Sequence, residues 1–176
     1  MSKFSIETRI NDTYIQEMIK LDNLVFKGKD IGDETKCKEW VKINPDIYTI
    51  LMESNKVIGY INFMPITEMC YNNFTKGNLK DYELNTDDII PFTKRKPLKC
   101  LLASIVIKPE YQNSQAIIEL WNGFINKIKT MEIIISSIVI DCVSEMGEKF
   151  IKRNLNVKFI TNSHNGKIYV GNLMEL

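Results

Sequence analysis

The pattern of apolar and polar positions at the start of the chain predicts one strand followed by two helices. Residues Phe4 to Ile10 alternate apolar and polar side chains, as a half-buried strand does. Apolar residues from Ile15 to Phe26 then recur with roughly helical spacing, and either Asn11 or Asp12 can cap this helix. A second, shorter helix is predicted from Asp33 to Ile43.

The next segment predicts a β-hairpin. Two runs rich in strand-forming residues, 47–52 and 57–63, flank the polar turn Ser54-Asn55-Lys56. Pro65 ends the second strand, because proline has no N–H to donate to a neighbouring strand.

The segment 67–99 is polar and irregular, and we treat it as an insertion between the third and fourth strands. A connection of this length is uncommon in a compact domain unless it has a function. We expect short helices over 68–74 and 87–91, and we expect the insertion to decide the substrate.

The second half of the chain alternates apolar runs of strand length with stripes of helical spacing. The predicted strands are 100–107, 132–140, 157–161 and 167–173, and the predicted helices are 117–128 and 144–155. Strands interleaved with helices predict an α/β fold in which helices cover both faces of a mixed sheet of about seven strands. The length fits a single domain spanning 1–176.

Composition excludes several classes of protein. The 23 basic and 22 acidic residues nearly cancel, which argues against the basic face that nucleic-acid binding needs. No apolar run approaches the ~20 residues of a membrane span, and the N-terminus lacks the apolar core of a secretory signal. The four cysteines are far apart and there is one histidine, so we expect reduced thiols, no metal site and a cytoplasmic protein.

One segment carries the candidate chemistry. The strand ending in Ile107-Lys108-Pro109 leads through a polar loop, with Tyr111 two residues after the proline, into a helix. This arrangement resembles the GNAT-type N-acetyltransferases, and the likeness in element order covers nearly the whole chain. The family reads Arg or Gln, two variable residues, Gly, a variable residue and Gly or Ala in this loop. Gln112 agrees with that pattern, whereas Gln115 and Ile117 replace both small residues.

The resemblance implies the acyl-CoA N-acyltransferase fold and acetyl-CoA as cosubstrate. In the family, backbone N–H groups at the start of the helix face the cofactor pyrophosphate. The strand before the loop positions the pantetheine, and one of its N–H groups polarises the thioester carbonyl. The cofactor-binding residues implied here are Ile105, Val106, Ile107, Gln112, Asn113, Ser114, Gln115, Ala116 and Ile117. Gln115 keeps its main-chain N–H but adds bulk where glycine would let the backbone approach closely.

A second family signature lies on the helix after the next strand. The nearest match is Met146, Phe150, Asn154 and Leu155, whose spacing agrees with the family. Phe150, however, stands where many members have the tyrosine that protonates the departing CoA thiolate, and phenylalanine cannot donate a proton.

The resemblance also implies transfer of an acetyl group to an amine, which requires a base and an acid. For the base we favour Glu68, a carboxylate expected to be partly desolvated at the start of the insertion, with Glu145 as a weaker candidate. For the acid we favour Tyr169, and Tyr111 and Tyr71 remain open.

The acceptor is the amine of a small molecule or of a protein. The departures at the loop and at Phe150 also favour an alternative, a catalytically degenerate module that binds acyl-CoA as a sensor or serves as an interaction domain. Self-association through the last strands, giving a homodimer, is a further option.

Overall fold

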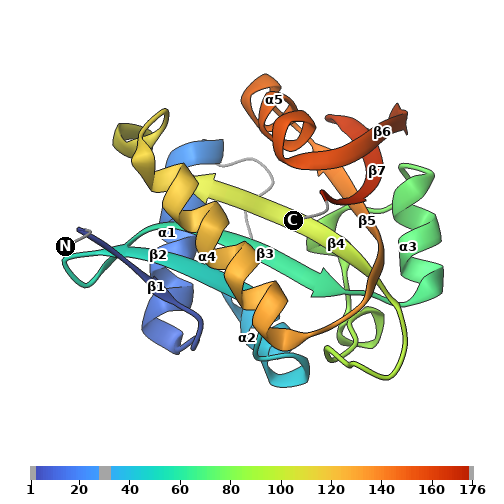
Figure 1. Cartoon of the computed structure of the whole chain (residues 1–176), viewed down its shortest axis with the longest axis horizontal. Coiled ribbons are helices and arrows are strands. Elements are labelled where there is room, and N and C mark those ends of the chain that lie inside the picture. The colour runs from blue at the N-terminus through green and yellow to red at the C-terminus, as the bar shows by residue number, and fades with distance from the viewer. Residues whose placement is uncertain (1–2, 28–32, 175–176) are drawn as a thin grey trace. The chain divides into compact units, whose positions relative to one another are not determined.

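The computed structural model of the protein describes residues 3–27 and 33–174 (Figure 1). Its helices and strands follow one another nearly as the sequence predicts. They are β1 (Phe4–Glu7), α1 (Asp12–Phe26), α2 (Glu34–Ile43), β2 (Tyr48–Glu53), β3 (Lys56–Pro65), α3 (Glu68–Thr75), β4 (Leu98–Ile107), α4 (Gln115–Met131), β5 (Ile135–Cys142), α5 (Glu145–Asn154), β6 (Leu155–Asn162) and β7 (Lys167–Leu173). Short 3₁₀ turns cover Asp81–Glu83, Thr86–Asp88 and Pro109–Tyr111.

The described strands form one seven-stranded sheet in the order β1-β2-β3-β4-β5-β7-β6. Strands β4 and β5 run parallel, from Leu98 opposite Ile135 to Leu101 opposite Val139. The β1–β2, β2–β3, β5–β7 and β6–β7 pairs are antiparallel. The predicted α/β class and mixed sheet are therefore confirmed.

The chain divides into two compact units, of which the first comprises 1–62 and 104–132. Within it, α4 lies across one face of β1, β2 and β3, while α1 and α2 lie on the opposite face (Figure 1). Asn11, Asp33 and Ser114 start these three helices, because their side chains accept hydrogen bonds from first-turn amides. The apolar stripes of the helices supply its core, which includes Ile15, Met18, Trp40, Ile50, Leu51, Ile61, Leu120 and Phe124.

The second unit comprises 63–103 and 133–176. Helix α5 packs against β5 and β6, and α3 packs against β5 and β7. The contact of α3 includes a hydrogen bond between the hydroxyls of Tyr71 and Ser137, 2.5 Å apart.

The insertion 67–99 is anchored at its base. Ile66 pairs with Ile89 in an isolated bridge, and Thr67 N donates to Asp88 O at 2.9 Å. The predicted helix over 68–74 is confirmed as α3. The one predicted over 87–91 is wrong, because the chain makes a single 3₁₀ turn at Thr86–Asp88 and then extends to pair with Ile66.

Two boundaries show how local chemistry limits the strands. Strand β1 ends at Glu7, short of the predicted Ile10, because the Glu7 carboxylate accepts from the N–H groups of Thr8 and Arg9 at 2.8 and 2.7 Å. In the hairpin, Ser54 and Asn55 both adopt positive φ, 49° and 60°, which gives a two-residue turn.

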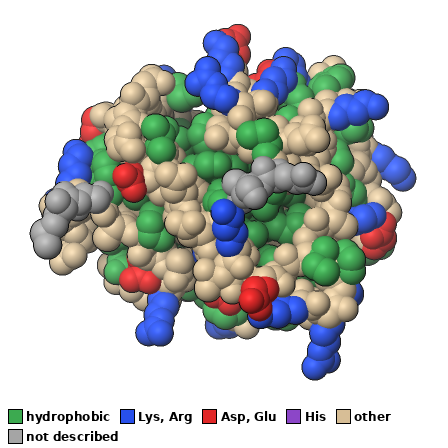
Figure 2. Space-filling view, viewed as in Figure 1, with side chains coloured by type: hydrophobic (Ala, Val, Ile, Leu, Met, Phe, Trp, Pro, Cys, Tyr) green, Lys and Arg blue, Asp and Glu red, His purple; other side chains and the backbone are tan. Residues whose placement is uncertain are grey.

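The surface carries charges of both signs. On the face drawn in Figure 2, Lys and Arg side chains and Asp and Glu side chains are scattered among uncharged ones, and the formal net charge of the chain is +1. Across residues 3–27 and 33–174, no helix combines the length and the apolar character that a membrane crossing requires.

Candidate functional site

The loop between β4 and α4 is shaped by its own side chains. Pro109 begins a 3₁₀ turn, and Asn113 takes a left-handed backbone conformation with φ of 60°. Ser114 then caps α4, because its Oγ accepts from Ala116 N at 3.2 Å and donates to Tyr111 O at 2.6 Å. The loop therefore makes the turn that leads into α4 without a glycine residue.

The start of α4 leaves backbone donors unused. Within the described part of the chain, the N–H groups of Gln115 and Ile117 have no hydrogen-bond partner, and only Ala116 N is capped. The Gln115 side chain is exposed, and Ile117 is half-buried. Unpaired amides at a helix N-terminus suit an anion such as a diphosphate.

Two other loop residues hold the loop to the sheet. Gln112 turns its side chain back, so that Nε2 donates to Ile107 O at 3.2 Å. The Tyr111 hydroxyl donates to the Glu53 carboxylate, and its ring meets Phe4 edge-on with centroids 6.2 Å apart. The bond to Glu53 is the main cause that raises the pKa of Tyr111, so Tyr111 keeps its proton in the hydrogen bond to the end of β2.

Backbone hydrogen bonds are made near both ends of β4. Lys108 N donates to Ile58 O at 2.8 Å, and Ile66 N donates to Lys99 O at 3.0 Å. Along β4, Ala103–Ile105 are half-buried, in the middle of a strand that is otherwise mostly buried.

The far end of β4 lies very close to β3. A Cβ atom at Gly59 would lie 2.5 Å from Ile107 Cδ1 and 2.8 Å from Val106 O. Glycine at position 59 thus allows the end of the proposed pantetheine strand to pack directly on its neighbour.

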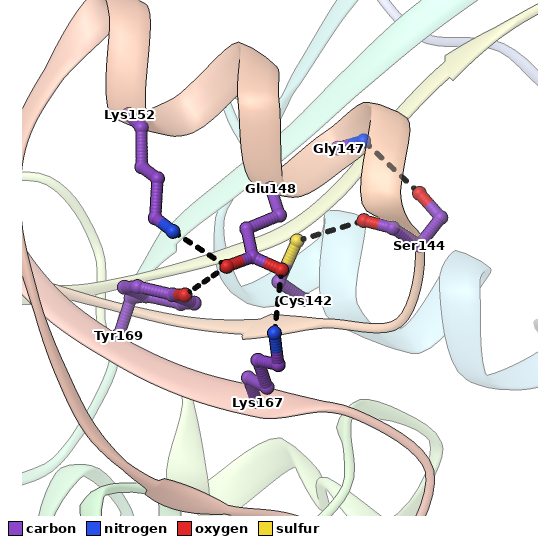
Figure 3. A network of polar contacts seen from close by, with 7 residues as sticks. All are labelled: Cys142, Ser144, Gly147, Glu148, Lys152, Lys167 and Tyr169. Carbon is purple, nitrogen blue, oxygen red and sulfur yellow. Dashed lines mark hydrogen bonds and ion pairs between the residues drawn. The ribbon is translucent and has the colours of Figure 1, made fainter.

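In the second unit, Tyr169 belongs to a charged network (Figure 3). Its hydroxyl donates to Glu148 Oε1 at 2.5 Å, and the same oxygen accepts from Lys152 Nζ at 2.6 Å. Lys167 Nζ donates to the other oxygen at 2.9 Å. Hydrogen bonds, first from Lys152 and then from Tyr169 and Lys167, lower the pKa of Glu148 to about 2. Burial and the bond to Glu148 raise the pKa of Tyr169, which therefore keeps its proton at neutral pH.

Cys142 and Phe150 lie before and after Glu148 in the sequence. The Cys142 thiol donates to Ser144 O at 3.5 Å, and burial raises its pKa, so it is a weak nucleophile. Phe150, at the family's tyrosine position, is half-buried on α5.

Glu68 begins α3 in the same unit. Its side chain is 66% exposed, and its Oε1 lies 2.5 Å from Lys99 Nζ. The same ammonium lies 4.7 Å above the Tyr71 ring. The expected partial desolvation of Glu68 is therefore wrong, because the carboxylate projects into solvent and pairs with a lysine.

A pocket of about 290 Å³ adjoins Glu68 and Lys99. It is lined by Ile66, Thr67, Glu68, Ile90, Lys96, Pro97, Leu98, Lys99 and Ser136. Most of these residues come from the two ends of the insertion. No group of three or more metal-ligating side chains occurs among residues 3–27 and 33–174.

Comparisons with known proteins find similar structures but no similar sequence family. No protein-family model matches the sequence, and a search of curated proteins finds no match. Solved structures do match. Ard1 from Thermoplasma volcanium superposes with a TM-score of 0.64 at 9% identity, over 99% of this chain and 100% of that one. The loading GNATL domain of CurA from Lyngbya majuscula superposes with a TM-score of 0.69 at 12% identity, over 96% and 97%.

A third match is a structure with a bound cofactor. The PaiA N-acetyltransferase from Thermoplasma acidophilum, in complex with coenzyme A, gives a TM-score of 0.56 at 13% identity, over 98% of this chain and 99% of that one. The chain therefore has the fold of the GNAT acyl-CoA N-acyltransferases. Because the identities are low, the likeness establishes the fold and leaves activity and substrate open.

Several side-chain contacts of the candidate residues could not be predicted from the sequence. Glu148 lies four residues before Lys152, which signals a helical ion pair, but its contacts with Tyr169 and Lys167 come from another strand. The pairing of Tyr111 with Glu53, 58 residues away, gave no sequence signal either.

Proposed function

We propose that the protein is an N-acetyltransferase that transfers the acetyl group of acetyl-CoA to an amine of a small molecule or a protein. The observation that carries this proposal is the start of α4, where the N–H groups of Gln115 and Ile117 have no partner in the described chain. These donors would hold the cofactor diphosphate. The fold and the matched structure with bound coenzyme A support the same reading.

The other proposed cofactor contacts lie along the strand and loop. The N–H groups of Ile105 to Ile107 would align the pantetheine, and that of Val106 or Ile107 would polarise the thioester carbonyl. Gln112 would act indirectly, by bonding to Ile107 O and thereby positioning the loop. Asn113 and Ser114 would shape the turn that presents the amides.

The proposed reaction needs two proton transfers. The amine nitrogen attacks the thioester carbon, a C–N bond forms and the C–S bond breaks. Glu68 would accept the amine proton, and Tyr169 would protonate the thiolate. Glu68 is exposed to solvent, from which a substrate would approach. Tyr169 keeps its proton, and in the resting protein its O–H group makes a hydrogen bond to Glu148. The hydroxyl would therefore have to turn from Glu148 to the sulfur.

One observation favours the alternative of a non-catalytic acyl-CoA-binding module. Phe150 stands at the family's acid position, and the Tyr169 proton is already engaged by a carboxylate fixed by two lysines. In that case cofactor binding would persist without transfer.

Cellular location and partners remain proposals. We propose a cytoplasmic protein that binds neither nucleic acid nor membranes, and a reducing compartment fits Cys37, Cys70, Cys100 and Cys142, which form no disulfide in the described residues. A homodimer through the outer strand β6 is also proposed, since Phe159 on this strand is 47% exposed.

Gln115→Pro should weaken acetyl-CoA binding by about 10- to 100-fold, the usual value of one hydrogen bond to a charged group. Proline removes the N–H of residue 115, yet it is tolerated at the first position of a helix. Ser114 already has the extended backbone, φ −112° and ψ 178°, that a residue before proline requires. Isothermal titration calorimetry with acetyl-CoA measures the effect.

The matched control is Gln115→Ala, which removes the side chain but keeps the N–H. It should bind acetyl-CoA within about threefold of wild type, because the Gln115 side chain is exposed. Equal affinity of the proline and alanine variants would exclude this amide as a phosphate donor, and absence of binding in the wild type would refute the proposed function.

Glu68→Gln and Tyr169→Phe should each lower kcat by about 100-fold or more at neutral pH if they act as base and acid, with little change in acetyl-CoA affinity. Release of free thiol with a panel of amines measures kcat. Glu145→Gln on α5 serves as a comparison for Glu68→Gln, because it tests the weaker base candidate. If both variants have the wild-type kcat, Glu68 is not the base and Tyr169 is not the acid, and the proposal of acetyl transfer still stands.

A further inference from the structure

The pocket between the two ends of the insertion is lined by residues of the second unit alone. Hydrogen bonds within this unit hold its walls. Ile66 N donates to Lys99 O at 3.0 Å, and Ser136 Oγ donates to Leu98 O at 3.0 Å. The walls are therefore fixed by contacts of the protein with itself, so the pocket does not need a ligand to form.

Two ammonium groups and one carboxylate line this pocket, on Lys96, Lys99 and Glu68. Lys99 Nζ is held in place, because it lies 2.5 Å from Glu68 Oε1 and 4.7 Å above the Tyr71 ring. Lys96 is exposed, and no ion pair among the described residues includes it. The pocket thus has one ammonium group that is already paired and a second one without an acidic partner.

The other large side chains of the lining are apolar. Ile66 and Leu98 are 2% and 1% exposed, Ile90 is half-buried and Pro97 is exposed. The volume of about 290 Å³ lies at the lower end of the roughly 300–1,000 Å³ typical of ligand pockets. The pocket therefore suits a molecule of the size of one amino acid, with an apolar part and charged groups.

We propose that this pocket binds a free amino acid with an apolar side chain. Its carboxylate contacts Lys96 and Lys99, its ammonium group contacts Glu68, and its side chain packs on the apolar wall. A phosphate ion would be repelled by Glu68, and an amine without a carboxylate would leave Lys96 unpaired, whereas a zwitterion meets all three charged groups with opposite charge. Glu68 is also the proposed base, but this inference concerns binding alone and does not depend on acetyl transfer.

The test is NMR titration of the isotope-labelled protein without acetyl-CoA. The ligands are leucine, isovalerate, which lacks the ammonium group, isoamylamine, which lacks the carboxylate, and inorganic phosphate. Leucine should bind with a Kd of about 1 mM, because its ion pairs are partly exposed to solvent. It should shift the amide signals of Thr67, Lys99 and Ser136, and it should bind more tightly than the other three ligands. Alanine should bind about 5- to 10-fold more weakly than leucine, because it buries less apolar surface.

Two variants separate the charged contacts. Lys96→Met should weaken leucine and isovalerate about three- to fivefold, as expected for an exposed ion pair, and should leave isoamylamine unchanged or tighter. Glu68→Gln should weaken leucine and isoamylamine by a similar factor. It should leave isovalerate unchanged or tighter, because Lys99 then loses its partner within the protein.

The matched control is Arg95→Met. Arg95 is the exposed cation next to Lys96, and it does not line the pocket. At 0.15 M salt, where charges are screened beyond about 8 Å, this variant should bind leucine within about 1.5-fold of wild type. Equal weakening in Arg95→Met and Lys96→Met would overturn the proposal, because net charge alone would then explain the effect.

Other results would also overturn the proposal. They are the absence of saturable leucine binding in the wild type, amide shifts that spare the pocket residues, phosphate binding as tight as that of leucine, or wild-type leucine affinity in Lys96→Met. If Lys96→Met does not fold, the order of the ligand affinities in the wild type decides. A wild type that binds leucine but not acetyl-CoA would refute the proposed function and support this inference, and the reverse result would do the opposite.

Discussion

Gly171→Ala should destabilise the protein by about 3 kcal/mol, at the upper end of the cost of overpacking. Gly171 lies in β7, opposite Ile138 of β5 and Val157 of β6. A Cβ atom there would clash with Asn156 O and would lie 2.8 Å from Val157 Cα. These are backbone atoms of the paired strand, which cannot rotate aside as a flexible side chain can. The β6 and β7 backbones would therefore have to separate.

Urea unfolding followed by circular dichroism measures this loss. A cost of about 3 kcal/mol is a large part of the 5–15 kcal/mol typical of a domain, and it should lower Tm by roughly 6–12 °C.

The matched control is Gly147→Ala on α5, where the new Cβ would lie 3.0 Å from Ser144 Oγ and 3.3 Å from Cys142 Sγ. Both atoms are on side chains, and alanine is the better helix former by about 1 kcal/mol, so the net change should be within about 0.5 kcal/mol. Equal stability of the two variants would contradict the close approach of β6 to Gly171.

Removing the titration of Lys127 should change how stability depends on pH. Lys127 Nζ on α4 donates to Asp46 O at 2.5 Å and to Tyr48 O at 2.7 Å. Burial lowers its pKa from 10.5 to about 8. Between these two pH values the unfolded chain retains a proton that the folded chain has released. The free energy of unfolding should therefore increase with pH across this window, by about 2–3 kcal/mol from this group.

The sign is distinctive because other buried groups act in the opposite direction. Burial raises the pKa of the Cys70 thiol to about 12 and also raises that of Cys100, so these groups lower stability as pH rises. The informative quantity is therefore the difference between the wild type and Lys127→Met, measured by urea unfolding from pH 7.5 to 10.5. Lys129→Met, an exposed lysine on the same helix, should keep the wild-type slope. Identical slopes in wild type and Lys127→Met would contradict the lowered pKa.

The cofactor loop shows how far local sequence can lead. The sequence Ile107-Lys108-Pro109, the polar loop after it and the helical stripe that follows predicted a strand, a turn and a helix, and all three are present. The absence of glycine did not prevent the turn, because Asn113 adopts the left-handed conformation that glycine would otherwise supply. The sequence could not tell which amides of the loop remain unpaired, since that depends on where Ser114 and Gln112 direct their side chains.

The catalytic candidates show the opposite case. Glu68 was chosen for its place after a strand, yet its exposure and its pairing with Lys99 depend on residues that are 31 positions apart. Tyr169 is a candidate acid because its phenol can donate a proton. Its hydrogen bond to Glu148 depends on the packing of α5 against the sheet. Position along the chain identifies such residues but does not reveal the partners that set their protonation.

The sequence by itself determined the order of strands and helices, the hairpin turn and the loop that leads into α4. These features depend on periodicity, caps and prolines within a few neighbouring residues. Only the tertiary structure decided that β7 lies between β5 and β6, and that the Tyr111 hydroxyl pairs with the Glu53 carboxylate. Each of these depends on backbones or side chains that are distant in sequence, and no local pattern records which distant groups meet.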